Sequence, residues 1–296
     1  MTWRSFLLTL YYHASRPARA WCYRCMAAQR RLPAIVLVYH RVADDGATPW
    51  TMPSALFVRQ MRWLQRHFDL VSLEETQRRI REGSGPRPSV SITFDDGYAD
   101  NCRTAIPWLV RERVPCTYFV TAQNALTGDA FPHDQDVGCH LPTNTLDQLR
   151  EMADLGIEIG AHSYTHANLG EIADPESLWR EVVAAKRTME DVLEREVRYF
   201  AYPYGGYVHL NREAFRLAEQ VGYLGVCSCY GGLNFPGDDP FHLQRIAVGN
   251  DMIHLKNWTT MDPRKLGTPR FLYRTREGGV GHRGDENPTP QPLAND

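Results

Sequence analysis

The sequence lacks three features that would narrow its function at once. It has no apolar run of the roughly eighteen residues that a transmembrane helix requires. Acidic and basic residues nearly balance, with a formal net charge of −2, so no global electrostatic feature favours nucleic-acid binding. The seven cysteines are odd in number and match no zinc-site spacing, which favours free thiols in a reducing compartment. We therefore expect a cytoplasmic protein, with an exported location as the alternative.

What the sequence does contain is a regular alternation of strand and helix patterns. Its 296 residues suffice for one large α/β domain. Strands are expected near residues 34–40, 89–95, 115–121, 157–162, 199–202, 223–228 and 243–248. Helical patterns separate them, including one that opens with a capping box, Thr145 and Gln148, and a long one from Asp174 to about Glu196. This alternation predicts a parallel sheet and favours a barrel.

Two adjacent carboxylates, Asp95 and Asp96, stand at the end of one expected strand. Gly97 follows them and lets the backbone turn, so both side chains can reach one cavity. Because like charges so close repel each other, a metal or a proton should separate their roles. Taken alone, the pair fits a helix cap or a loop equally well.

Two histidines, His162 and His166, follow another expected strand. If the segment between them turns helically, both lie on one face. Imidazole is the commonest metal ligand, and zinc sites often combine two histidines with one carboxylate and leave a position for water. Beside the acidic pair, the two histidines indicate a metal site rather than a structural pair.

A third segment, Arg198–Gly206, reads as a strand that ends in a Pro/Gly turn. Such a turn can present backbone N–H groups to a ligand, although an ordinary strand-to-loop transition has the same composition.

Together these segments resemble the polysaccharide deacetylases of the NodB homology type (carbohydrate esterase family 4). Thr93–Gly97 is similar to the first family motif, His162–His166 to the second and Arg198–Gly205 to the third. The resemblance extends over about residues 34 to 250. It implies a distorted (β/α)7 TIM-like barrel and an enzyme that removes acetyl from an N-acetylated sugar in a polysaccharide, oligosaccharide or glycolipid.

The resemblance also implies a cofactor. Asp96, His162 and His166 would hold a divalent metal, most often Zn2+, with Co2+, Ni2+ or Mn2+ as alternatives. A metal with an open position polarises the acetamide carbonyl and acidifies bound water.

The remaining roles follow from the same likeness. Asp95 would be the general base, and Arg198 would hold it in place and keep it ionised. Tyr204 would offer its backbone N–H to the oxyanion, and Pro203 with Tyr204 would contact the substrate. Trp50 is a candidate platform for stacking a sugar ring.

The general acid departs from the most familiar family pattern, because residues 223–248 lack the late histidine motif. Ala34–Val42 instead resembles the early Tyr-His segment of deacetylases that act on exported poly-N-acetylglucosamine. This implies that His40 is the acid, with His254 as the alternative and a structural histidine at a strand end as the competing interpretation. Asp238 or Asp239 is conceivable as the group that orients His40.

The two ends of the chain differ from its centre. Residues 1–32 form a basic segment that we expect to be either an amphipathic helix on an anionic membrane surface or a helix packed on the outside of the barrel. Its apolar candidates are Trp3, Phe6, Leu7, Leu10 and Tyr11. Residues 33–266 form the deacetylase domain, and residues 267–296 are expected to be a disordered tail.

Two other functions stay open at this point. One is a metal-dependent hydrolase of another amide or C–N bond on the same barrel, and the other is a non-catalytic glycan-binding relative. The presence of Asp95 beside the metal-ligand set argues against the second, because a binding module needs no base there.

Overall fold

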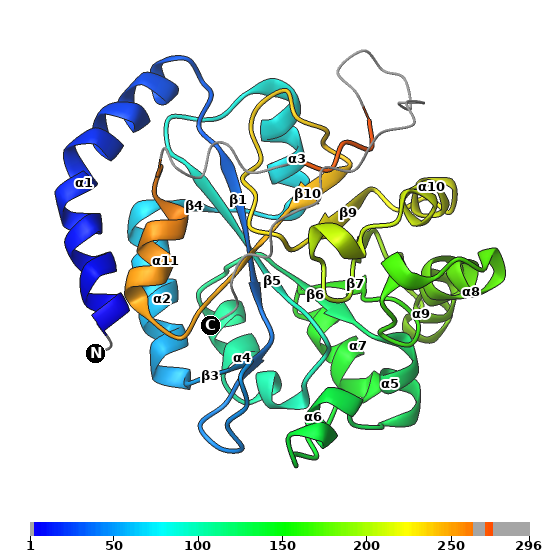
Figure 1. Cartoon of the computed structure of the whole chain (residues 1–296). Helices are drawn as coiled ribbons and strands as arrows, with labels where there is room; N and C mark the ends of the chain where they lie inside the picture. The colour runs from blue at the N-terminus through cyan, green and yellow to red at the C-terminus, as the bar shows by residue number, and fades with distance from the viewer. Residues whose placement is uncertain (1–2, 263–269, 275–296) are drawn as a thin grey trace.

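A computed structural model describes residues 3–262 and 270–274, and its centre is a sheet of parallel strands wrapped into a barrel (Figure 1). The order of its path is β10-β9-β8-β7-β6-β5-β1-β11, and β4 pairs with β5 beside this path. The strands are β1 (Ala34–Tyr39), β4 (Asp69–Leu70), β5 (Ser89–Phe94), β6 (Cys116–Val120), β7 (Glu158–Ala161), β8 (Tyr199–Ala201), β9 (Gly225–Ser228), β10 (His242–Gln244) and β11 (Ile246–Ala247). A separate parallel pair is formed by β2 (Arg41–Val42) and β3 (Thr51–Met52).

One residue, Arg245, lies where the barrel nearly closes. It separates β10, which pairs with β9 through Gln244 and Ser228, from β11, which pairs with β1 through Ile246 and Leu37. The chain therefore changes its pairing partner from β9 to β1 across this single residue, which brings the first and last strands of the barrel together. The expected distorted barrel of parallel strands is confirmed.

Helices surround this sheet on its outer face (Figure 1). They are α1 (Trp3–Ala28), α2 (Ser54–His67), α3 (Leu73–Glu82), α4 (Ala105–Arg111), α5 (Ala122–Thr127), α6 (Pro132–Asp136), α7 (Leu146–Asp154), α8 (Pro175–Trp179), α9 (Ala185–Leu193), α10 (Arg212–Gln220) and α11 (Met252–Thr259). Short 3-10 turns cover Ala99–Cys102, Leu169–Glu171 and Tyr207–His209. The capping box of Thr145 and Gln148 at α7 is confirmed. The long helix expected after Asp174 is α8 and α9 joined through a π-helical turn, Arg180–Ala184.

Side chains alternate between the two faces of the sheet, as extended strands require. In β1, Ile35, Leu37 and Tyr39 pack in the large core between sheet and helices, whereas Val36 belongs to a smaller cluster inside the barrel. That inner cluster comprises Val36, Leu73, Ile80, Phe119, Tyr199, Ala201, Cys227 and Leu243. Because two of its members come from α3, this helix covers the end of the barrel where the strands begin. The opposite end, where the strands finish, is the one left for chemistry.

The N-terminal helix α1 lies along the outside of the barrel, beside α11 (Figure 1). The guanidinium of Arg19, which is buried, donates to the Asn257 side-chain oxygen at 2.7 Å, and the Tyr11 hydroxyl donates to Asp262 at 2.9 Å. Within the described residues, no helix combines the length and hydrophobicity needed to cross a bilayer.

The segment expected to be a disordered tail is partly packed. Phe271 stacks on Phe215 with ring centroids 5.0 Å apart, and Tyr273 is buried against the same ring. The expectation is therefore wrong for residues 270–274, where aromatic side chains fix the chain against α10. Residues 267–269 and 275–296 lie outside the described residues.

Candidate metal and catalytic site

Strand alternation brings three of the expected site residues to the same mouth of the barrel. Val36 in β1 faces the barrel interior, and His40, four residues later and just past the strand end, is directed to the same side because alternate residues share a face. In the same way Asp95 follows Thr93 at the end of β5, and His162 follows Gly160 at the end of β7. Since the strands are parallel, these ends meet at one rim.

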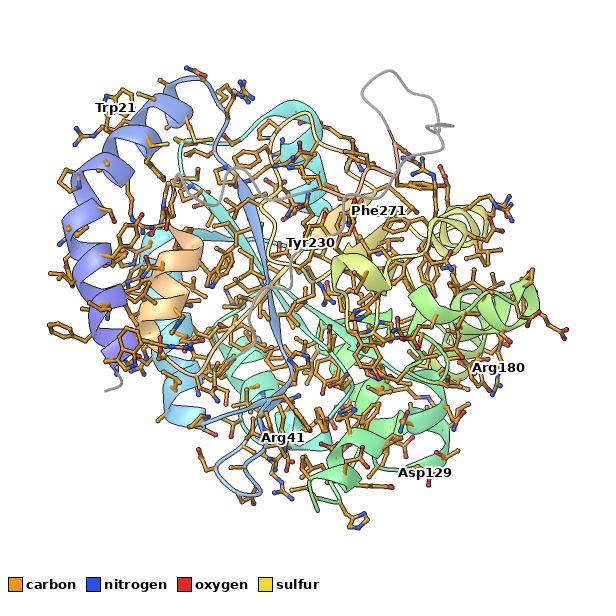
Figure 2. All side chains as sticks on the ribbon, in the orientation of Figure 1. Trp21, Arg41, Asp129, Arg180, Tyr230 and Phe271 are labelled. Carbon is orange, nitrogen blue, oxygen red and sulfur yellow. The ribbon has the colours of Figure 1, made fainter. Side chains whose placement is uncertain are left out.

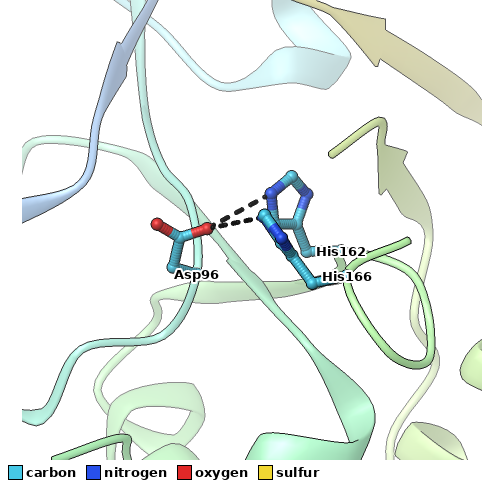
Figure 3. A group of neighbouring side chains, drawn as sticks. All are labelled: Asp96, His162 and His166. Atoms are coloured by element: carbon cyan, nitrogen blue, oxygen red, sulfur yellow. Dashed lines mark ion pairs between the residues drawn. The ribbon is translucent and has the colours of Figure 1, made fainter. Parts of the chain in front are cut away.

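The three expected metal ligands converge (Figure 3). Asp96 Oδ1 lies 3.4 Å from His162 Nε2 and 3.2 Å from His166 Nε2. One ligand atom from each residue falls within 4.8 Å of the other two. This arrangement is a possible metal site of two nitrogens and one oxygen.

The backbone around these ligands aims them. His162 Nδ1 lies 2.9 Å from the Ala201 carbonyl oxygen, so Nδ1–H donates there and the Nε2 lone pair is left for Asp96 or a cation. The segment between the two histidines does not turn helically, since Ser163 and His166 have φ values of 60° and 64°. Instead the His166 N–H donates to the Ser163 hydroxyl at 2.9 Å, and a tight bend brings the two rings together.

A buried carboxylate, Glu181, holds this bend in place. It accepts hydrogen bonds from the backbone N–H groups of Tyr164 at 3.0 Å and Thr165 at 2.8 Å, and from the Thr165 hydroxyl at 2.7 Å. Glu181 lies in the π-helical turn, a distortion that is frequent at functional sites. Sequence reasoning missed it. The signal in the sequence was that Glu181, a charged residue, stands three positions after the buried Leu178 and so falls on the buried side of the helix.

Strained backbone gathers at the same place. Of the seven non-glycine residues with positive φ in the described part of the chain, four lie here: Asp96, Ser163, His166 and Tyr204. Such conformations cost roughly 1–3 kcal/mol each and persist where the surroundings impose them.

A buried carboxylate oxygen facing two imidazole nitrogens fits a borderline divalent cation such as Zn2+.

The partner of Asp95 is Arg245. Two guanidinium nitrogens of Arg245 lie 2.6 and 2.8 Å from the two carboxylate oxygens, and the arginine is fully buried. The expectation that Arg198 holds Asp95 is wrong, because Arg198 pairs with Glu158 at 2.6 Å and with Glu74 at 3.1 Å. Arg198 precedes the first residue of β8 and so lies at the end of the barrel opposite the site.

Sequence reasoning missed Arg245 although a signal was present. The residue interrupts the otherwise apolar and polar-neutral stretch Leu243–Val248, which was expected to be a buried strand. A buried arginine requires a carboxylate partner, but the pattern alone does not say which one.

Burial and charge act in opposite directions on the two aspartates. Burial disfavours the ionised form of Asp95, but its neighbours, chiefly the Arg245 guanidinium and then His162, together lower the pKa of Asp95. Burial likewise opposes ionisation of Asp96, yet hydrogen bonds from His162 and His166 hold its pKa well below the usual range. Both carboxylates are therefore ionised near neutral pH, as a base and a cation ligand must be.

The two candidate acids occupy different environments. His40 is half-buried and lies beside the aspartate pair, because Tyr39 pairs with Phe94 and the Asp95 N–H donates to the Tyr39 carbonyl at 2.9 Å. His254 is 46% exposed and pairs with Asp251, the residue that caps α11. This geometry favours His40, whose role as the acid stays a prediction.

The aspartates conceived as orienting His40 are engaged elsewhere. Asp238 accepts from the Phe235 N–H at 2.7 Å and pairs with Arg270. Asp239 accepts from the Phe241 N–H at 2.9 Å. Each organises the loop before β10, so neither expectation holds.

The candidate sugar platform Trp50 lies at the rim of the site. Its indole N–H donates to Asp134 at 3.0 Å, and its ring meets His133 edge-on at 4.8 Å. The His133 ring is in turn 5.5 Å from His166. Asp134 is itself buried and accepts from the hydroxyl of Tyr98 at 3.0 Å.

The turn after β8 reaches the same rim. Pro203 is buried, whereas the Tyr204 ring is 59% exposed and 5.3 Å from the His166 ring. The proposed oxyanion contact of the Tyr204 N–H stays a prediction.

Comparison with known proteins agrees with this geometry. The family model described as polysaccharide deacetylase matches residues 82–226, which include the Asp95–Asp96 pair and the second and third motifs. The chain belongs to the polysaccharide deacetylase family. A Bacillus subtilis (strain 168) protein named for the same family, YxkH, is 28% identical over 73% of this chain and 72% of its own length.

More distant relatives of this family member extend the comparison. Poly-beta-1,6-N-acetyl-D-glucosamine N-deacetylase of Staphylococcus aureus (strain MRSA252) is 21% identical over 76% of this chain and 82% of its own. The structure of IcaB from Ammonifex degensii superimposes with a TM-score of 0.64 at 23% identity, over 77% of this chain and 97% of that one. The deacetylase PplD of Streptococcus pyogenes, solved with acetate, gives 0.65 at 22% identity, over 78% and 100%. These superpositions support the barrel fold.

Proposed function

We propose that this protein is a metal-dependent deacetylase that hydrolyses the N-acetyl group of an N-acetylated sugar in a polysaccharide, an oligosaccharide or a glycolipid. The observation that carries this proposal is the juxtaposition of two devices at one rim. Asp96, His162 and His166 converge on one point, and beside them Asp95 is held ionised by Arg245. Hydrolysis of an amide requires a group that polarises the carbonyl and a base that deprotonates water, and a cation site with an adjacent carboxylate can supply both.

The residues present fit a divalent metal, of which Zn2+ suits the two nitrogens and one oxygen best. When bound, the cation would polarise the amide carbonyl and increase the acidity of water. The Ala201 carbonyl keeps the His162 ring oriented for this ligation, and Glu181 keeps the bend that presents His166.

The protein's own groups move the protons. Asp95 takes one proton from the attacking water as the oxygen bonds to the acetyl carbon. The Tyr204 N–H donates to the carbonyl oxygen as negative charge develops there. His40 then gives a proton to the sugar nitrogen as the C–N bond breaks, because an amine anion is a poor leaving group. The products are acetate and the free amino sugar.

The substrate class rests on the relatives and on the rim. The S. aureus relative is named for poly-beta-1,6-N-acetyl-D-glucosamine, an N-acetylated polysaccharide. Trp50 and the exposed Tyr204 ring provide aromatic faces on which a pyranose can pack.

The test is acetate release from N-acetylated oligosaccharides and from lipid-linked N-acetyl sugars, with and without added Zn2+. The variant Asp95→Asn keeps the size of the side chain and removes the base, and Asp191→Asn on the exposed surface of α9 is its matched control. We expect release by the wild type and by Asp191→Asn only. Equal acetate release by Asp95→Asn would refute the mechanism. If the protein hydrolysed other amides but no N-acetylated sugar, the proposed substrate class would be wrong.

A further inference from the structure

The outward face of α1 reverses the usual arrangement of a surface helix. Helices on globular proteins generally bury their apolar residues and expose their polar ones. In α1 the exposed side chains include Trp3, Phe6, Leu7, Leu10 and Trp21, which are between 50% and 71% exposed. They make up five of the thirteen large hydrophobic residues exposed anywhere in the described chain.

These five residues, here called the outward face, form one stripe. At 100° per residue, Trp3 and Trp21 fall at the same angle, and the other three lie within about 60° of them. Figure 2 shows Trp21 on the side of α1 that points away from the barrel. The stripe therefore runs along the free side of a helix about 39 Å long.

The inward face of α1 is fixed to the body of the protein by polar contacts. Arg19 lies on the opposite side of the helix from Trp3 and Trp21 and is 4% exposed. It hydrogen-bonds to Asn257, Thr260 and Asp262. Cys22 and Met26 also pack against the core. The apolar stripe therefore cannot turn inward without breaking a buried charge pair and this packing.

The charge of α1 indicates which kind of surface the outward face binds. The helix contains Arg4, Arg16, Arg19 and Arg24 and no acidic residue. Arg4 and Arg24 are exposed and lie on the two sides of the stripe, about 100° and about 60° from Trp3 by the same count. Two copies of this face brought together would oppose arginine to arginine, which disfavours self-association. An apolar stripe flanked by arginines is instead typical of a helix lying on anionic lipid.

The position of the stripe also relates it to the catalytic site. The chain runs along α1 in one direction and returns through β1 in the other, so the Trp3 end of α1 lies toward the end of the barrel where β1 finishes (Figure 1). His40 and the metal-ligand set are at that same end.

We propose that the outward face of α1 binds the surface of an anionic lipid bilayer, with the helix lying in the membrane plane and the barrel mouth held near the lipid headgroups. The guanidinium groups of Arg4 and Arg24 meet the phosphates, and the aromatic and leucine side chains enter the acyl boundary. The proposal does not depend on the reaction that the site carries out.

The experiment is co-sedimentation of the full chain with vesicles of phosphatidylcholine alone or with about 30% phosphatidylglycerol. We expect binding to the anionic vesicles, a blue shift of tryptophan fluorescence on binding, and release at high salt. The double variant Phe6→Glu/Leu10→Glu should lower the partition coefficient at least about tenfold, since each side chain contributes that much by leaving water. Arg4→Glu/Arg24→Glu should abolish the preference for anionic lipid.

The matched control is Leu155→Glu/Leu224→Glu, which places the same charges on hydrophobic residues that are 53% and 45% exposed elsewhere. Circular dichroism and acetate release establish that each variant is folded, and vesicle binding is read without any turnover. Unchanged binding by Phe6→Glu/Leu10→Glu, or equal loss in the control, would overturn the proposal. So would a dimer by light scattering that this variant dissociates while vesicles stay unbound.

Discussion

Replacing Arg245 by methionine should remove activity and destabilise the protein, whereas the same change at Arg198 should do neither. Arg245 is fully buried and holds both oxygens of Asp95, at 2.6 and 2.8 Å. Arg198 is 33% exposed and pairs with Glu158 and Glu74 at the other end of the barrel. Methionine keeps much of the length and volume of arginine, so the comparison isolates the charge.

The expected magnitudes follow from burial. Breaking a buried ion pair on one side leaves an uncompensated charge and costs about 3–5 kcal/mol of the free energy of unfolding. Asp95 can avoid this cost by taking up a proton, because burial then raises its pKa without opposition from Arg245. Either way the base is lost near neutral pH, which lowers turnover by about a hundredfold or more. The partly exposed pair of Arg198 is worth less than about 1 kcal/mol.

The assay combines acetate release as a function of pH with denaturant unfolding of both variants. The residual activity of Arg245→Met should appear only at higher pH than in the wild type, since Asp95 must lose a proton that it no longer readily gives up. Adding Asp95→Asn to Arg245→Met should restore part of the lost stability, because no charge is then left unpaired. Equal effects of the two arginine variants on turnover, or full activity of Arg245→Met, would refute this account of the base.

Three further predictions concern other parts of the site and core. His40→Ala should lower turnover strongly with bound metal unchanged by elemental analysis, while His254→Ala should match the wild type; loss of metal would make His40 a ligand. Glu181→Gln should weaken metal affinity about tenfold in a competition titration with a chelator, because the bend that presents His166 loosens; unchanged affinity would contradict the role of Glu181. Burial lowers the pKa of His242 to about 4 from 6.5, so the unfolded chain binds a proton first and stability should fall as pH drops through this window. His242→Gln should remove up to about 3 kcal/mol of that fall in acid unfolding curves, and an unchanged slope would refute the assignment.

The sequence allowed much of the site to be predicted because its residues lie at strand ends. The alternation of side chains along each strand directs His40 and Asp95 toward the barrel interior, and parallel strands bring their ends to one rim. His162 and His166 needed only their place after β7, although the bend between them is stabilised by Glu181 rather than by a helical turn. Local patterns were sufficient to single out the aspartate and histidine pairs because each pattern spans a few neighbours, whereas His40 was predicted from the family resemblance.

Partners distant in the chain could not be predicted in this way. Arg245 was missed although it stands within an expected buried strand, and only barrel closure between β10 and β11 sets it against Asp95, 150 residues away. Arg198 lies at the opposite end because it precedes the first residue of β8. For α1, the sequence determined an amphipathic basic helix, and the tertiary structure decided which face is buried. Arg19 reaches a hydrogen-bonding cluster beside α11, and the free energy of pairing that buried charge turns the apolar stripe toward the solvent.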